Sequence, residues 1–129
     1  MANPNIVSVS SIYAGNAAWD LTTSTNTTLW TVAADVVAKI NYIGATNSHA
    51  TTAATVTLDI NGIGTAVTGV SGTSLATQAF ICNEISVPGD DLLVIIDKPI
   101  YLMEADVLRG SASVATISLF ISFEILNDA

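Results

Sequence analysis

Alternation between apolar and polar residues is the main signal along this chain, and it predicts β-strands over most of its length. The clearest case is residues 117–125, where Ile, Leu, Ile, Phe and Ile alternate with mostly small or polar residues. Residues 55–60 alternate in the same way and place Val56, Leu58 and Ile60 on one face of a strand. Further strands are expected at residues 6–9, 12–21, 29–32, 36–43, 75–85 and 100–102. The pattern therefore predicts an all-β protein.

Three short stretches depart from simple alternation. Residues 92–96 form a wholly apolar run, which is typical of a strand that is buried on both faces. Gly15 and Asn16 interrupt the strand expected at 12–21, and they fit a hairpin turn or a bulge. Residues 33–35 fit either a plain connection between strands or one helical turn.

Turn-forming residues separate the strands. Residues 87–91 combine the fixed φ of a proline with the permissive backbone of a glycine. Asn61 and Gly62 follow a regular strand and form the strongest hairpin signal, because both residues tolerate positive φ. Residues 66–68 are then expected to return as the second strand of that hairpin. Residues 104–106 make an acidic corner near the end of the chain.

The number and spacing of these elements predict one domain. About eight short strands, with turns roughly every 8–12 residues, are typical of a sandwich or jelly roll. We therefore expect a single-domain antiparallel β-sandwich, jelly-roll-like in its arrangement, over residues 6–129. Residues 1–5 are expected to precede it as an extended arm, because Pro4 fixes its own φ and biases Asn3 toward extended geometry.

The chain is poor in charge for a soluble domain. Asp, Glu, Lys and Arg make up 11% of it, against about 25% in ordinary soluble domains. The net charge is −8, and the basic residues are Lys39, Lys98 and Arg109. This balance argues against nucleic-acid binding, which requires clustered Lys and Arg. The exterior is either a smooth Thr, Ser and Ala surface or is largely buried against other chains. We favour the second and expect a homo-oligomer.

Cysteine content and terminal composition bear on the compartment. Cys82 is the only cysteine, so no intramolecular disulfide and no oxidising compartment is implied. The first residues lack the basic and apolar regions of a signal peptide. No apolar run approaches the ~20 residues that span a bilayer. We expect synthesis in a host cytoplasm, solubility there and no membrane partner.

Residues with catalytic chemistry are few and isolated. His49 is the only histidine, and no HxH, HExxH or Cys/His cluster accompanies it. We interpret His49 as an ordinary loop residue. Cys82 follows an apolar stretch and is expected to be a buried thiol rather than a nucleophile. No catalytic residue is predicted, and the chain is not expected to be an enzyme.

Carboxylates concentrate in the last third of the chain, at Asp90, Asp91, Asp97, Glu104 and Asp106. Oxygen-rich loops can bind Ca²⁺, but the EF-hand spacing is absent. Glu104 and Asp106 have the residue types of a glycosidase pair, but a small domain without an aromatic sugar cleft gives this little support. We interpret the group as solvated turn residues and predict no metal ligand and no cofactor.

Trp19 and Trp30 have two interpretations. Tryptophan combines a large apolar surface with one polar N–H group, so it serves as an anchor in cores and interfaces or as a platform for carbohydrate. We favour a core or interface anchor for both.

Both ends of the chain resemble a known group of proteins. Residues 1–7 read MANPNIV and are followed by SIYAG at 11–15. Later come VPGD at 87–90, an apolar strand, KPIYL at 98–102 and DVLR at 106–109. These stretches resemble small virion structural proteins of tailed phages of marine bacteria, cyanobacteria among them. In those relatives the acidic corner usually reads Glu-Gly-Asp. This chain has alanine in place of the glycine, and glycine is the residue that adopts positive φ most readily.

The resemblance implies a non-enzymatic virion structural protein with a β-sandwich fold. Its implied place is the head exterior, as a capsid decoration or cement protein that binds the major capsid protein, with a trimer as the preferred state. A head fibre or tail-associated adhesin that recognises host glycans is the alternative, as is a neck or tail component.

An interface with another chain is expected at two places. The first is the uncharged arm, which can add to an exposed strand edge of a sister subunit or of the major capsid protein. The second is the pair of tryptophans. The residues are Met1, Ala2, Asn3, Pro4, Asn5, Trp19 and Trp30.

Overall fold

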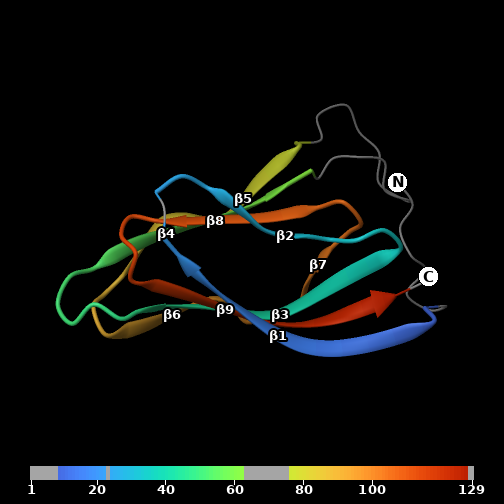
Figure 1. Ribbon diagram of the computed structural model, residues 1–129, viewed down its shortest axis with the longest axis horizontal. Helices are drawn as coiled ribbons and strands as arrows, with labels where there is room; N and C mark the ends of the chain where they lie inside the picture. The colour runs from blue at the N-terminus through green and yellow to red at the C-terminus, as the bar shows by residue number, and fades with distance from the viewer. Residues whose placement is uncertain (1–8, 23, 63–75, 128–129) are drawn as a thin grey trace.

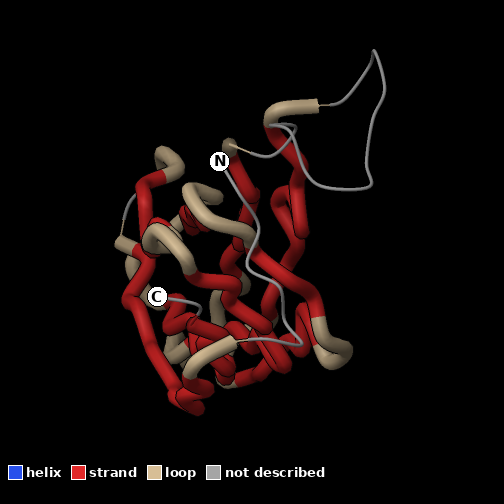
Figure 2. Tube along the Cα trace, turned by 90° about the vertical axis from the view of Figure 1, so that its right-hand side faces the viewer, coloured by secondary structure: helices blue, strands red, loops and turns tan. Residues whose placement is uncertain are grey.

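The chain folds into two stacked antiparallel sheets (Figure 1). The computed structural model describes residues 9–22, 24–62 and 76–127. Within these ranges there are nine strands and no helix, so none that could cross a bilayer (Figure 2). The strands are β1 (Ser11–Leu21), β2 (Thr27–Thr31), β3 (Val36–Asn47), β4 (Ala54–Asn61), β5 (Gln78–Val87), β6 (Asp91–Ile96), β7 (Ile100–Leu102), β8 (Val107–Ala112) and β9 (Ile117–Asn127). The predicted all-β class is confirmed.

The strand order is that of a jelly roll. Sheet A has the order β1-β9-β3-β6, with β7 also pairing with β3, and sheet B has the order β2-β8-β4-β5. The antiparallel pairs are nested along the chain: β1 with β9, β2 with β8, β3 with β6 and β7, and β4 with β5. In this nested arrangement the first four strands pair with later strands as in one long hairpin. The hairpin folds so that its strand pairs are divided between the two sheets. The expected β-sandwich with a jelly-roll-like arrangement is confirmed.

The core lies between the sheets and is formed by the inward face of each strand. In β9, Ile117, Leu119 and Ile121 are at most 1% exposed. In β4, Val56 and Leu58 are fully buried. The alternation predicted for these two strands is therefore confirmed, because one side of each strand faces the opposite sheet.

β6 differs from its prediction. It lies at an edge of sheet A, and only one of its faces meets the core. Leu93 and Ile95 pack against the core, whereas Leu92 and Val94 point away from it and are 50% and 47% exposed. The prediction that this run is buried on both faces is wrong, because its second apolar row lies on the outer surface.

The interruption predicted in the first long strand is also wrong. β1 continues through Gly15 and Asn16 and pairs with β9 in one unbroken register, without a hairpin or a bulge. The connection at residues 33–35 contains a turn rather than a helical turn, and Asp35 there has a φ of 58°.

The hairpin signal at Asn61 and Gly62 is half right. Gly62 has the positive φ expected of it, at 88°. However, Asn61 pairs with Gln78, so no two-residue turn closes the β4–β5 pair at Asn61 and Gly62. The return strand predicted at residues 66–68 lies outside the described residues.

One central strand had no prediction. β8 lies between β2 and β4 in sheet B, and its sequence Val-Leu-Arg-Gly-Ser-Ala contains a charge, a glycine and two small residues. The predicted arm at residues 1–5 lies outside the described residues, as do residues 6–8 of the predicted first strand.

Candidate functional site

Trp19 and Trp30 line one apolar groove. Trp19 is on β1 at the edge of sheet A, and Trp30 is on β2 at the edge of sheet B, so the groove lies where the two edges meet. Ala17, Phe123 and Ile125 complete the lining, and the groove has a volume of about 310 Å³. The ring centroids of Trp30 and Phe123 are 5.0 Å apart, with the rings inclined at 51°. The structure therefore brings the two candidate tryptophans into a single site.

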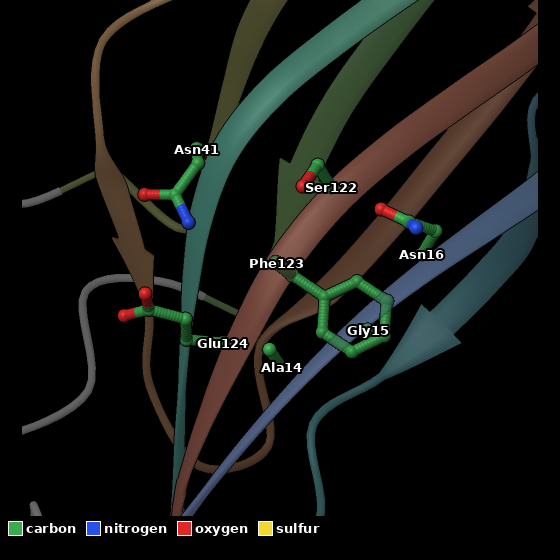
Figure 3. Close-up of a pocket in the computed structure, with 7 residues that line it drawn as sticks. All are labelled: Ala14, Gly15, Asn16, Asn41, Ser122, Phe123 and Glu124. Carbon is green, nitrogen blue, oxygen red and sulfur yellow. The ribbon is translucent and has the colours of Figure 1, made fainter.

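The sequence of β1 makes room for this groove. Because side chains alternate along a strand, Gly15, Ala17 and Trp19 share the side of β1 that faces it. A Cβ atom at Gly15 would lie 2.9 Å from the tip of the Phe123 ring. Figure 3 shows this ring lying against β1 at Gly15. The missing side chain thus lets Phe123 pack beside β1, where it also reaches Trp30.

A shallow hollow lies on the outer face of sheet A, next to Gly15 (Figure 3). Asn16 from β1, Ser122 from β9 and Asn41 from β3 line it side by side. Glu124 at its rim forms an ion pair with Lys39 at 3.7 Å. Two amides and a hydroxyl offer hydrogen bonds, but they supply no general acid or base.

His49 and Cys82 both have structural partners. The Nδ1 atom of His49 accepts hydrogen bonds from the backbone N–H groups of Thr51 at 3.2 Å and Thr52 at 2.9 Å, so the ring closes its own loop. The Cys82 thiol donates to the carbonyl of Val56 at 3.7 Å, and burial raises its pKa. A raised pKa depletes the thiolate that a nucleophile needs.

The acidic corner caps backbone groups. Glu104 accepts a hydrogen bond from the N–H of Asp35 at 2.8 Å, and Asp106 accepts one from the N–H of Met103 at 2.9 Å. Asp106 is 4% exposed, and burial raises its pKa even though the bond from Met103 opposes this effect. The prediction of a solvated turn residue is therefore wrong for Asp106. Ala105 has a φ of 69°, so the turn keeps a left-handed geometry without glycine.

The other acidic residues of this region lie in turns or, for Asp91, at the start of a strand. Asp90 has a φ of 52°, and the Asp91 carboxylate accepts a hydrogen bond from the N–H of Leu92 at 2.8 Å. Asp97 is exposed between β6 and β7. Over the described ranges, no three His, Cys, Asp or Glu residues lie close enough together to hold a metal ion.

A buried polar cluster on sheet B was missed by the sequence analysis. Asp59 on β4 is fully buried, and Arg109 on β8 donates to both its oxygens, from Nε at 2.8 Å and from Nη2 at 2.6 Å. Gln78 and Asn26 donate to the same carboxylate at 2.6 and 3.1 Å. Burial acts to raise the pKa of Asp59, but the hydrogen bonds and the charge of Arg109 outweigh it and hold the pKa below its ordinary value. The signal in the sequence is a lone arginine and an aspartate at an outward strand position.

Asn47 is a second buried polar group that sequence reasoning missed. Its Nδ2 donates to the carbonyls of Thr52 at 2.9 Å and Val87 at 3.0 Å. Its Oδ1 accepts from the hydroxyl of Thr116 at 2.8 Å and from the N–H of His49 at 3.0 Å. The amide therefore ties three loops together at one end of the sandwich.

Comparison with known proteins gives little. No protein-family model matches the chain, and no curated protein matches it. One solved structure, from work showing that Bacillus endospore appendages form a novel family of disulfide-linked pili, covers 92% of this chain and 90% of its own. The identity is 13% and the TM-score is 0.46, so this likeness carries no argument.

Proposed function

We propose that the chain is a non-enzymatic structural protein that joins protein chains into a larger assembly, and that this assembly is the exterior of a tailed-phage capsid. The groove at Trp19 and Trp30 carries the first part of the proposal. All five of its lining side chains are apolar, and it opens at the edges of both sheets. Apolar surface gains free energy when another chain covers it.

A protein segment fits this groove better than a sugar does. Sugar sites place hydrogen-bonding groups around an aromatic platform, because each sugar hydroxyl loses water on binding. Apart from the two indole N–H groups, the side chains that line the groove have no polar atom. The adhesin alternative therefore gains no support from Trp19 or Trp30.

The bonds of the candidate catalytic groups support a non-enzymatic role. His49 holds its own loop, and Glu104 and Asp106 hold the corner between β7 and β8. A general acid or base needs a proton-accepting atom that is free to reach a substrate. One carboxylate oxygen of Glu104, one of Asp106 and the Nδ1 atom of His49 are engaged with backbone N–H groups.

The capsid setting comes from the resemblance at both ends of the chain. A jelly-roll fold agrees with it but hosts many functions, so the fold alone decides nothing. The net charge of −8 agrees as well, because a protein on the head exterior benefits from repelling the phosphates of the packaged genome. The proposed partners are the major capsid protein and sister subunits.

Binding to capsids tests the proposal. The full chain is mixed with phage heads that lack it, and the bound copies per head are counted after sedimentation. We expect saturable binding at a fixed number per head, and a loss of affinity of about tenfold or more for Trp30→Ala, since aromatic anchors dominate such contacts. The control is Tyr101→Ala, which removes an exposed aromatic ring on β7, away from the groove. Absence of binding, or equal losses in both variants, contradicts the proposal.

A further inference from the structure

We propose that two copies of this chain pair through β1, antiparallel about a two-fold axis at Asn16, with Tyr13 of each copy covering the groove of the other. The inference rests on the assembly role proposed above and names one partner for it, a second copy of the chain. Its evidence is the edge of sheet A.

Three of the four sheet edges carry features that discourage pairing with another chain. Short strands, bulges, charges and prolines all have this effect. β2 has five residues and a register shift against β8. β5 has two register shifts against β4, and its Glu84 has a φ of 51°. The far edge of sheet A is divided between β6, with six residues, and β7, with three, and residues 97–99 between them read Asp-Lys-Pro.

β1 is not short, bulged or interrupted by a proline. It has eleven residues in unbroken register with β9. It contains no proline and no basic residue, and Asp20 is its single charge. Among the described strands it pairs with β9 alone, so its other edge presents a row of backbone N–H and C=O groups. A long, regular and nearly uncharged edge is suited to adding a strand from another chain.

The sequence of β1 is complementary to itself. A register that uses all eleven residues of both copies places Ser11 opposite Leu21 and Asn16 opposite its own copy. On the groove side, the same register places Tyr13 opposite Trp19. Directly opposite residues of an antiparallel pair have Cβ atoms about 4.5–5.5 Å apart. Tyr13, which is 59% exposed in the single chain, thereby reaches the ring of Trp19 and the groove beside it.

This register also keeps the charges apart. A net charge of −8 opposes self-association in general. In the pair, however, Asp20 faces Ile12, and the two Asp20 carboxylates are roughly eight residues apart, which is about 27 Å along the strands. That separation exceeds the Debye length of about 8 Å at physiological salt.

The symmetry limits the assembly. A two-fold contact uses the same surface on both copies and closes on two subunits. It therefore yields a dimer, and it is compatible with the trimer implied by the resemblance only as a link between two trimers.

A charge swap at the axis tests the pair. Asn16→Lys and Asn16→Asp each place two like charges opposite one another, and each is expected to shift the chain from dimer to monomer in sedimentation. An equimolar mixture of the two variants is expected to recover the dimer, with one copy of each, because opposite charges then meet. Thr46→Lys is the control, since it puts the same charge on an exposed position of interior strand β3. A wild-type monomer, or a mixture that stays monomeric, overturns the proposal.

Cysteine pairs test the register. In a Cys82→Ser background with oxidised glutathione as the oxidant, Asn16→Cys is expected to form a disulfide with its own copy. Ala14→Cys alone is expected to stay uncrosslinked, but it should crosslink when mixed with Ala18→Cys, which lies opposite it. Equal crosslinking of Ala14→Cys with itself refutes the register.

These measurements are made without capsids, so the two proposals fail separately. A chain that is monomeric but binds heads refutes the β1 pair and leaves the proposed function standing. A dimer that binds no heads does the reverse.

Discussion

The outer face of sheet B and the free edge of sheet A differ in whether their polar and apolar groups have partners within the same chain. On sheet B, the buried carboxylate of Asp59 receives hydrogen bonds from Arg109, Gln78 and Asn26. At the edge of sheet A, the outer backbone groups of β1 meet no other described strand, and the groove at Trp19 lies open beside them. The first region is complete within one chain, whereas the second is suited to completion by another chain.

This difference separates residues that hold the fold from residues that form contacts between chains. A buried, fully bonded cluster fixes strands relative to each other, and removal of one partner leaves a desolvated charge without its counter-charge. An open apolar groove contributes less to the single chain, and its substitutions are expected to act mainly on association. The two regions should therefore respond differently to mutation.

The largest effect is expected from Arg109→Met. The substitution leaves the buried Asp59 carboxylate without its cation and is expected to lower the free energy of unfolding by about 3–5 kcal/mol. Urea unfolding followed by tryptophan fluorescence measures it. Lys39→Met is the control, because it breaks the partly exposed pair with Glu124 and should cost less than about 1 kcal/mol. Similar losses in the two variants would show that the Asp59 cluster is no stronger than a surface ion pair.

A smaller effect is expected from Gly15→Ala, which should change both the stability of the fold and the lining of the groove. The new Cβ atom meets the Phe123 ring, and moving that ring is expected to cost about 1–3 kcal/mol. Because Phe123 contacts Trp30, the tryptophan emission should change as well. Asn16→Ala is the control, since its side chain points to the other face of β1. Unchanged stability and emission in Gly15→Ala would mean that Phe123 does not depend on the missing side chain.

Two buried carboxylates should respond to pH with opposite signs. The pKa of Asp59 is lowered on folding, so its ionised form stabilises the fold above its ordinary pKa of 3.8, and this contribution is lost as the pH falls through the folded value. The pKa of Asp106 is raised, so stability is lost as the pH rises from 3.8 through the folded value. As the pH rises from about 3 to about 7, the free energy of unfolding of Asp106→Asn should increase relative to that of the wild type. That of Asp59→Asn should decrease relative to the wild type over the same range. Parallel trends in the two urea series contradict this assignment.

The smallest effect concerns the corner between β7 and β8. Ala105 has a φ of 69°, where a Cβ atom costs about 1–2 kcal/mol and glycine costs nothing beyond its greater entropy loss on folding. Ala105→Gly is therefore expected to raise the free energy of unfolding by about 0.5–1 kcal/mol. Ala115→Gly, in a turn without positive φ, should lower it by a similar amount. Equal destabilisation by both would place Ala105 in an ordinary conformation.

The local pattern of apolar and polar residues predicted where the strands form better than it predicted what packs against them. Alternation in β9 and β4 is set by which side faces the core, and a short window of sequence contains it. The apolar run of β6 was misread because burial of its outer face depends on whether another layer of the protein covers that face. β8 was missed because Arg109 and a glycine break the pattern, although that arginine points to a partner in β4.

The candidate site was predicted in its residues but not in its geometry. Trp19 and Trp30 were recognisable as anchors from their chemistry alone. Their meeting in one groove depends on β1 pairing with β9 and β2 pairing with β8, far apart in sequence. The match between Asp59 and Arg109 has the same origin, since these residues are brought together only by the β4–β8 register.

The position of β9 has a consequence for how the chain reaches its fold. β9 lies between β1 and β3 in sheet A, although it follows the eight other described strands in sequence. During synthesis, β1 therefore leaves the ribosome long before its own partner exists. Topologies that depend on such distant pairings fold slowly, in about milliseconds to seconds. Until β9 pairs with it, β1 has two unpaired edges, so neighbouring nascent chains compete with β9 for pairing with β1.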